Sequence, residues 1–181
     1  MTTLATPRLI LRPFESADIP AYADIRAKPH VVQYLSGGAA GAAQAWESAK
    51  ERVPAFQAIW QEPGGYGPWA VVEKASGQLI GHCGLRVWDA LGGATELLYM
   101  LDDTAWGKGY ATEAARASVR FGFEVLKLDE IVAVALPENS ASIRVMERAG
   151  MRRLPGFTTV LGKTAVKCVL RREDWLAGEG A

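Results

Sequence analysis

The spacing of hydrophobic residues along this chain changes repeatedly between the pattern of strands and the pattern of helices. Short apolar runs bounded by glycine, proline or polar residues predict strands, and apolar positions three or four residues apart predict helices. The runs predict strands at 9–14, 69–74, 78–85, 95–101, 131–136, 157–161 and 164–170. The wider spacing predicts helices at 16–27, 39–60, 111–126 and 140–149.

Two of these helices carry a distinct inner face. In the helix at 39–60 the apolar stripe comprises Trp46, Val53, Phe56 and Trp60. In the helix at 111–126 the inner face is made mostly of small residues, which let a helix lie close to a sheet: Ala111, Ala114, Ala115, Ser118, Phe121, Gly122 and Val125. The strand at 95–101 is apolar on both faces, which favours a central position.

The order of the elements predicts a mixed α/β fold of the α+β kind rather than a regular alternation of strand and helix. A chain of 181 residues is long enough for one domain with a substantial core. No repeat or linker divides it, so we expect a single domain over residues 1–181, with an ordered core at about 7–175. The end of the chain, 171–181, is expected to be a polar tail.

Composition excludes several classes of function. The net charge is +0, which argues against nucleic acid as the main partner. No apolar run is long enough to cross a membrane, and the first residues do not resemble a secretion signal, so we expect a cytoplasmic protein. Cys83 and Cys168 lie in apolar runs and are expected to be buried free thiols. With only two histidines and two cysteines, scattered along the chain, no metal site is expected.

The most informative segment is the glycine turn, residues 106–112, between the strand at 95–101 and the next helix. The first backbone N–H groups of a helix have no intrahelical partner and carry partial positive charge, and glycine lets an anion approach closely. The spacing fits neither a P-loop nor a dinucleotide-binding fingerprint. The segment therefore predicts a site for a pyrophosphate group.

The motifs of the chain resemble those of GNAT acetyltransferases, in particular the branch of ribosomal-protein N-terminal acetyltransferases. Residues 106–111 resemble the family pattern Gln/Arg-x-x-Gly-x-Gly/Ala, with Trp106 in the first position. Three further segments, 6–13, 80–85 and 139–151, resemble motifs of the same branch in the same order, as does the Arg-Glu-Asp-Trp at 172–175. The resemblance implies a GNAT fold, with a mostly antiparallel central sheet whose fourth and fifth strands, here 95–101 and 131–136, splay apart.

The resemblance also implies the co-substrate, acetyl-CoA, and the residues that bind it. The pyrophosphate would lie on the backbone of Trp106, Gly107, Lys108, Gly109, Tyr110, Ala111 and Thr112. Main-chain groups of Met100 and Leu101 would pair with the pantetheine arm. Asn139, also a good helix N-cap, would bind the same arm, with Ser142 one turn along the helix.

Acetyl transfer to an amine needs a group that removes a proton from the ammonium ion. Glu96, a charged residue in an otherwise apolar central strand, is the first candidate, and His82 on the neighbouring strand is the second. Each also has a structural interpretation, Glu96 as an ion-pair partner and His82 as a half-buried strand residue. Many GNAT enzymes protonate the thiolate with a tyrosine at the position of Met146, so here Ser142 is the candidate acid.

We therefore expect an N-acetyltransferase that acetylates a primary amine, either a protein N-terminus or a small molecule, as a monomer or homodimer. Because Met146 cannot donate a proton, a non-catalytic acyl-CoA-binding or sensing protein with the same fold is the alternative. A nucleotide-binding protein that uses the glycine turn is a weaker third hypothesis.

Overall fold

The computed structural model describes residues 2–62 and 64–179, and its strands form one continuous mixed sheet. The strand order is β1-β2-β3-β4-β5-β6-β9-β7, and β8 pairs with β9. The strands are β1 (Leu4–Ala5), β2 (Leu9–Arg12), β3 (Pro68–Glu73), β4 (Leu79–Trp88), β5 (Ala94–Leu101), β6 (Glu130–Ala135), β7 (Arg152–Arg153), β8 (Thr158–Val160) and β9 (Lys163–Arg171). The mixed α/β class expected from the sequence is confirmed.

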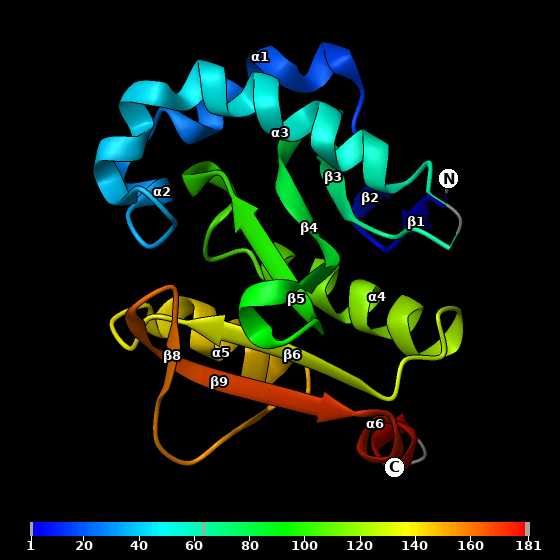
Figure 1. Ribbon diagram of the computed structural model, residues 1–181. Helices are drawn as coiled ribbons and strands as arrows, with labels where there is room; N and C mark the ends of the chain where they lie inside the picture. Colours follow the sequence, from blue (N-terminus) through cyan, green and yellow to red (C-terminus); the bar gives the residue numbers. More distant parts are fainter. Residues whose placement is uncertain (1, 63, 180–181) are drawn as a thin grey trace.

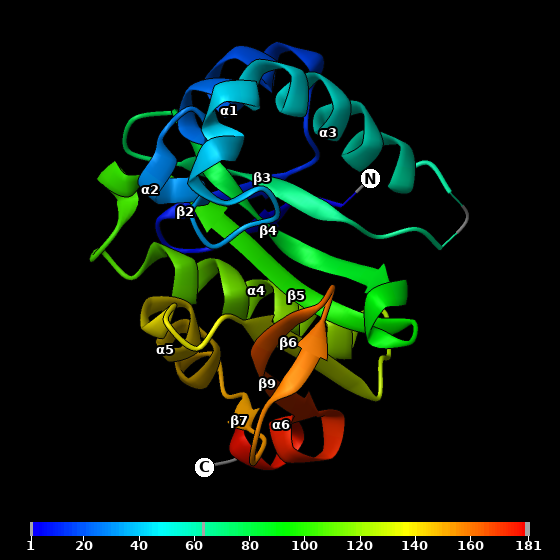
Figure 2. The same ribbon diagram turned by 60° about the vertical axis from the view of Figure 1, so that its left-hand side comes forward.

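Helices cover both faces of this sheet. The α-helices are α1 (Ile19–Arg26), α2 (Pro29–Val32), α3 (Ala45–Ile59), α4 (Tyr110–Glu124), α5 (Ser140–Arg148) and α6 (Arg172–Glu179). Short 3-10 helices are η1 (Ser16–Asp18), η2 (Gly38–Gln44), η3 (Asp89–Leu91) and η4 (Asp103–Ala105). Figure 1 shows α1 and α3 side by side over one face, and Figure 2 shows α4 and α5 on the other.

Strands β5 and β6 are neighbours in the sheet but are paired at one position only. Strands β4 and β5 are antiparallel along their whole length, from Gly81 opposite Leu101 to Trp88 opposite Ala94. Strands β5 and β6 are parallel, and their register contains a single pair, Glu96 with Val132. Beyond Glu96 the two strands diverge, as expected for the strands at 95–101 and 131–136, and the gap opens toward Leu101.

The core has a part on each face of the sheet. Trp69, Leu85 and Phe123 are buried between the sheet and α4. Tyr22 and Val53 are buried between the sheet and the α1–α3 layer. The sheet is therefore held between two hydrophobic layers, which fixes the position of its central strands.

The structure corrects the inner face expected for two helices. Trp46 is 49% exposed, because Ala45 and Ala49 take the inward positions of α3 and a helix turns by about 100° per residue. Val125 is 61% exposed because α4 ends at Glu124, so Val125 is only the C-cap.

Other differences lie in short or polar segments. Residues 38–44 form η2 rather than the start of a long helix, and the segment between the predicted helices at 16–27 and 39–60 contains α2. Residues 172–179 of the expected polar tail form α6, and residues 180–181 lie outside the described residues. Trp175 anchors α6 by packing on Phe123 at 5.5 Å between ring centroids. Cys83 and Cys168 are buried free thiols, as expected. Among the described residues, no helix is long and apolar enough to cross a membrane.

Candidate active site

A cavity of about 350 Å³ lies where β5 and β6 diverge. Its wall is formed by the end of β5, the glycine turn, the first turns of α4 and α5, and the segment from α2 to Leu35. The residues predicted to bind the co-substrate line it, with the exception of Lys108: Met100, Leu101, Trp106, Gly107, Gly109, Tyr110, Ala111, Thr112, Asn139 and Ser142. Tertiary structure thus brings together segments that are about forty residues apart in the sequence.

The glycine turn presents the N-terminus of α4 to this cavity. Gly107 and Gly109 have φ angles of +72° and +79°, in the left-handed region that favours glycine. Gly109 is the N-cap of α4, and no side chain caps the helix. A Cβ at Gly107 would meet no atom within 4 Å, so open space lies in front of the turn. The uncapped N–H groups can therefore receive an anionic ligand.

Arg8 holds the turn in place from the N-terminal segment. Its Nη1 donates to the Lys108 carbonyl at 2.8 Å, and its Nε and Nη2 contact Glu113 Oε2, each at 2.6 Å. Thr6 Oγ1 also donates to Glu113, and the Arg8 guanidinium lies 4.6 Å from the Tyr110 ring centre. The opening motif of the chain therefore fixes the geometry of the glycine turn.

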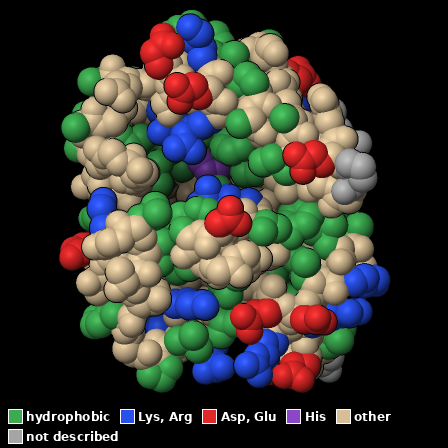
Figure 3. Space-filling model, in the orientation of Figure 1, with side chains coloured by type: hydrophobic (Ala, Val, Ile, Leu, Met, Phe, Trp, Pro, Cys, Tyr) green, Lys and Arg blue, Asp and Glu red, His purple; other side chains and the backbone are tan. Residues whose placement is uncertain are grey.

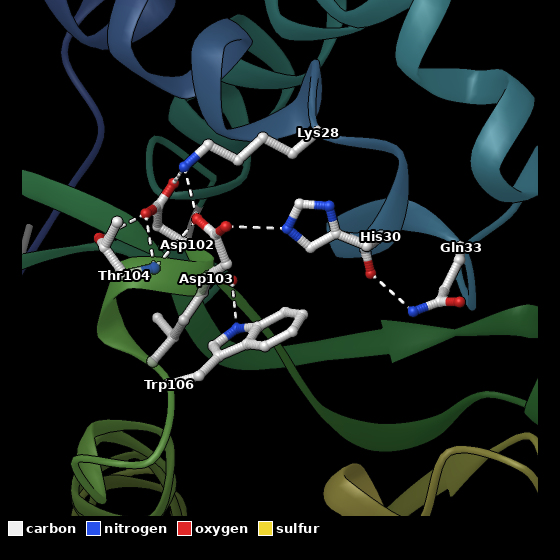
Figure 4. Close-up of polar contacts among 8 residues, drawn as sticks. Lys28, His30, Gln33, Asp102, Asp103, Thr104 and Trp106 are labelled. Carbon is white, nitrogen blue, oxygen red and sulfur yellow. Dashed lines mark hydrogen bonds and ion pairs between the residues drawn. The ribbon is translucent and has the colours of Figure 1, made fainter.

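On the other side of the turn, a polar network joins the segment 28–33 to η4 (Figure 4). Lys28 Nζ donates to Asp102 at 2.7 Å and to Asp103 at 2.5 Å, and His30 Nε2 lies 2.8 Å from the Asp103 carboxylate. The hydrogen bonds from Lys28 and His30 lower the pKa of Asp103.

Trp106 closes this network. Its indole Nε1–H donates to the Leu101 carbonyl at 2.9 Å, and its ring lies edge-on to His30. Trp106 thus places a hydrogen-bond donor at the first position of the glycine motif. Its bond uses the Leu101 carbonyl, one of the main-chain groups predicted to pair with the pantetheine arm.

Asn139 is the N-cap of α5, as predicted, because its Oδ1 accepts from Ser142 N at 3.1 Å. The same turn holds a pair of hydroxyl groups that spans the gap between β5 and α5. Tyr99 Oη lies 2.9 Å from Ser142 Oγ and donates to the Ser142 carbonyl at 2.8 Å. Burial raises the pKa of Tyr99, so the hydroxyl stays protonated at neutral pH.

Tyr99 lines the cavity but was not predicted from the sequence as a site residue. The available signal was its place two residues before Leu101 on the strand that ends at the glycine turn, because residues at i and i+2 share a face of a strand. Met146, at the position of the family tyrosine, is buried and lies outside the cavity lining.

The two candidate bases lie on the α1–α3 face of the sheet and do not line this cavity. Glu96 Oε2 accepts from Arg86 Nε and Nη2, both at 2.7 Å. Burial raises the pKa of Glu96, and Arg86 opposes that rise. Glu96 is therefore an ion-pair partner. A raised pKa also makes its carboxylate a stronger base than an ordinary glutamate.

His82 is buried at 6% exposure, with Nδ1 3.0 Å from the Tyr22 hydroxyl. Burial, together with the charges of Arg26, Arg52 and Arg86, lowers the pKa of His82 to about 3. The imidazole is therefore neutral at physiological pH. Figure 3 shows a hollow on this side of the molecule, with basic side chains and a histidine in it.

Met100 connects this hollow with the cavity. It pairs with His82 in the β4–β5 register, its sulfur lies 3.9 Å from Arg26 Nη1, and it is part of the cavity lining. The two candidate binding regions therefore meet at the end of β5, one on either side of Met100.

This combination of diverging central strands, an uncapped helix N-terminus and a glycine turn agrees with the comparisons with known proteins. Residues 8–152 match the family model for the acetyltransferase (GNAT) domain. The chain therefore belongs to the GNAT acetyltransferase family. A curated relative, the uncharacterized N-acetyltransferase YnaD of Bacillus subtilis, is 31% identical over 173 residues, which cover 95% of this chain and 91% of YnaD.

Solved structures share the fold along almost the whole chain. A GNAT-family acetyltransferase from Bacillus anthracis superposes with a TM-score of 0.75 at 25% identity, covering 95% of this chain and 99% of the other. RimL, a ribosomal L7/L12 alpha-N-protein acetyltransferase solved with coenzyme A, gives a TM-score of 0.76 at 15% identity, covering 94% and 98%.

Proposed function

We propose that this protein transfers the acetyl group of acetyl-CoA to a primary amine. The observation that carries the proposal is the cavity between β5 and β6, because it ends on the uncapped N-terminus of α4 and contains the residues predicted for the co-substrate. The structure of RimL with coenzyme A supports the choice of co-substrate through the shared fold.

The residues around the cavity fit the chemical groups of acetyl-CoA. The backbone amides from Gly107 to Thr112 suit a pyrophosphate, since they carry the partial positive charge of a helix N-terminus and open space lies before Gly107. The separation of β5 from β6 leaves main-chain groups near Met100 without a strand partner on that side, which suits the amides of a pantetheine arm.

The co-substrate supplies a thioester with a thiolate as leaving group. During transfer a C–N bond forms and the C–S bond breaks, so the amine must lose a proton and the sulfur must gain one. We assign proton removal to Glu96, directly or through water, because its pKa is raised by burial. His82 is the weaker base, since a group with a pKa of about 3 takes a proton from an ammonium ion poorly.

We assign protonation of the sulfur to the pair of Ser142 and Tyr99. Both residues line the cavity, and their hydroxyl oxygens are 2.9 Å apart. When Ser142 gives its proton to the sulfur, the Tyr99 hydroxyl can turn from the Ser142 carbonyl and give its proton to Ser142 Oγ, and water then returns a proton to Tyr99. This pair provides the acid that Met146 cannot provide. It therefore favours an enzyme over the alternative of a non-catalytic acyl-CoA-binding protein.

The first experiment is thiol release from acetyl-CoA with a panel of amines, together with calorimetry of CoA binding. Gly107→Ala tests the glycine turn, and Gly156→Ala is the matched control, because both glycines have a φ near +70° and no atom within 4 Å of an added Cβ. Both variants should lose about 1 kcal/mol of stability from backbone strain.

Only Gly107→Ala should weaken CoA binding, by tenfold or more. Equal CoA binding by the two variants would remove the turn from the site. CoA binding without acetylation of any amine would favour the non-catalytic alternative, and an absence of CoA binding by the wild type would refute the proposal.

A further inference from the structure

Three arginines from three different elements lie near His82: Arg26 at the end of α1, Arg52 in α3 and Arg86 in β4. All three act on His82, whose pKa their charges help to lower. Arg52 and Arg86 are partly exposed, whereas Arg26 is only 4% exposed. The three arginines therefore differ from ordinary surface arginines, whose guanidinium groups are fully hydrated.

Acidic groups do not balance this cluster. Glu96 is paired with Arg86. Among the residues that the structure describes, no carboxylate lies within 4.0 Å of the Arg26 or Arg52 guanidinium groups. Arg52 Nε donates to Ser48 Oγ at 3.2 Å. Arg26 Nη1 donates to the weak acceptor Met100 Sδ at 3.9 Å, and the Arg26 guanidinium lies 5.8 Å from the centre of the Tyr22 ring. Arg26 Nε is buried without a hydrogen-bond partner.

An unpaired buried charge is costly, since burial removes the hydration of the ion, and the loss is offset only by hydrogen-bond acceptors or by a partner of opposite charge. A purely structural arginine at this position would be expected to have a carboxylate or several carbonyl partners. Neither is present for Arg26 in the described part of the chain. The cluster is thus incomplete without an anion from outside the chain.

The cluster also lies at the right place for the second substrate. Met100 separates Arg26 from the cavity, so an anion held by Arg26 and Arg52 would lie just beyond the end of β5. The amine of the same molecule could then point past Met100 toward the cavity. The reaction would take place at the junction of the two regions.

We propose that the acceptor is a small primary amine that carries a carboxylate, bound by Arg26 and Arg52. This inference rests on the proposed acetyltransferase function and names the substrate class of the same site. A guanidinium group presents parallel N–H donors that match the two oxygens of a carboxylate. The positive cluster also lowers the pKa of a nearby ammonium ion, which favours the free amine that the transfer needs.

The same cluster disfavours polycations such as diamines, because a second ammonium group would lie against the arginines. The test compares three acceptors of similar length in the thiol-release assay: 4-aminobutyrate, 4-aminobutyramide and 1,4-diaminobutane. We expect kcat/KM for the carboxylate to exceed that for either other amine by at least tenfold. A preference for the amide or the diamine would overturn the inference and leave the acetyltransferase proposal intact.

An amidated dipeptide Ala-Asp, compared with Ala-Asn, shows whether a peptide can supply the same carboxylate. Transfer to Ala-Asp with none to 4-aminobutyrate would overturn the assignment to a small amine. Glutarate, which has carboxylates but no amine, should compete with 4-aminobutyrate. If no amine is acetylated, calorimetric titration of glutarate into the CoA-bound protein still decides the question: binding to the wild type supports the arginine site, and no binding refutes it.

Two variants assign the effect to the cluster. Arg52→Gln, at a partly exposed position, should raise KM for 4-aminobutyrate by at least tenfold and leave KM for 4-aminobutyramide within twofold. Arg26→Gln should do the same if it folds. Arg152→Gln, at an exposed position on β7, is the matched control and should behave as the wild type. An equal change for both acceptors in Arg52→Gln would show that the arginine acts only on structure.

Discussion

Burial of a neutral His82 should make the folded protein sensitive to acid. In the folded state burial and the surrounding arginines hold the pKa of His82 at about 3, whereas an unfolded histidine has a pKa of about 6.5. Between these two values the unfolded chain binds a proton that the folded protein does not bind. The free energy of unfolding therefore falls as the pH falls from about 6.5 toward 3.

The size of the effect follows from the difference between the two pKa values. Each pH unit in this window corresponds to about 1.4 kcal/mol, so His82 should cost the folded state roughly 2 to 3 kcal/mol at a pH of about 4.5. That is a large share of the stability of a typical domain, about 5–15 kcal/mol. Carboxylates also titrate in this range, so the contribution of His82 has to be isolated by a variant.

His82→Gln provides this comparison, because glutamine cannot take up a proton and its side chain can still accept from Tyr22. Urea unfolding at pH 7.5 and pH 4.5 gives the acid-induced loss of stability for each protein. The loss should be roughly 2 to 3 kcal/mol smaller in His82→Gln than in the wild type. His30→Gln reports the share of the exposed histidine. Equal losses in the wild type and His82→Gln would refute the assignment of a neutral, arginine-surrounded His82.

Three further predictions concern catalysis and the glycine turn. The kcat/KM of the wild type should rise with pH through a pKa above the usual glutamate range, because burial raises the pKa of Glu96 and the base must be ionised. Glu96→Gln should lose this rise with pH and should lower kcat at least 100-fold. Its CoA affinity should be unchanged in calorimetry. Tyr99→Phe should lower kcat about tenfold or more and leave the Kd for CoA within twofold, whereas an unchanged kcat would exclude Tyr99 from the proton path. Arg8→Met should lower the free energy of unfolding by about 1 kcal/mol in denaturant titrations and weaken CoA binding, since Lys108 and Glu113 lose a shared partner. A variant with wild-type CoA affinity would show that the glycine turn keeps its conformation without Arg8.

The sequence predicted the elements that are specified by local chemistry. Alternating and helical spacing located the main strands and α4, and the preference of asparagine for a helix N-terminus located the start of α5. The two-residue strands β1 and β7 are too short to show a period, and α6 depends on the contact between Trp175 and Phe123. Trp46 was predicted to lie on the inner face of α3 but is exposed. The spacing of apolar residues shows that they share a face, but it does not show which face of the helix packs on the sheet.

The candidate site shows the same division. The glycine turn is visible in the sequence because only glycine readily adopts the left-handed conformation of Gly107 and Gly109. The likeness of the turn to a family motif is the basis for the proposed co-substrate. The pair of Tyr99 and Ser142 was not visible, since the two residues are far apart in the chain and meet only when α5 packs beside β5.

What the sequence determined by itself was therefore the class of fold, the main elements and the glycine turn, all of which depend on the conformations of neighbouring residues. Only the tertiary structure decided how far β5 separates from β6 and that Glu96 is paired with Arg86. It also decided that Arg26 and Arg52 lie buried or half-buried with no acidic partner among the described residues. The physical reason is that pKa values and charge balance depend on distances across the fold, which no local pattern encodes. The substrate class proposed here rests on those distances.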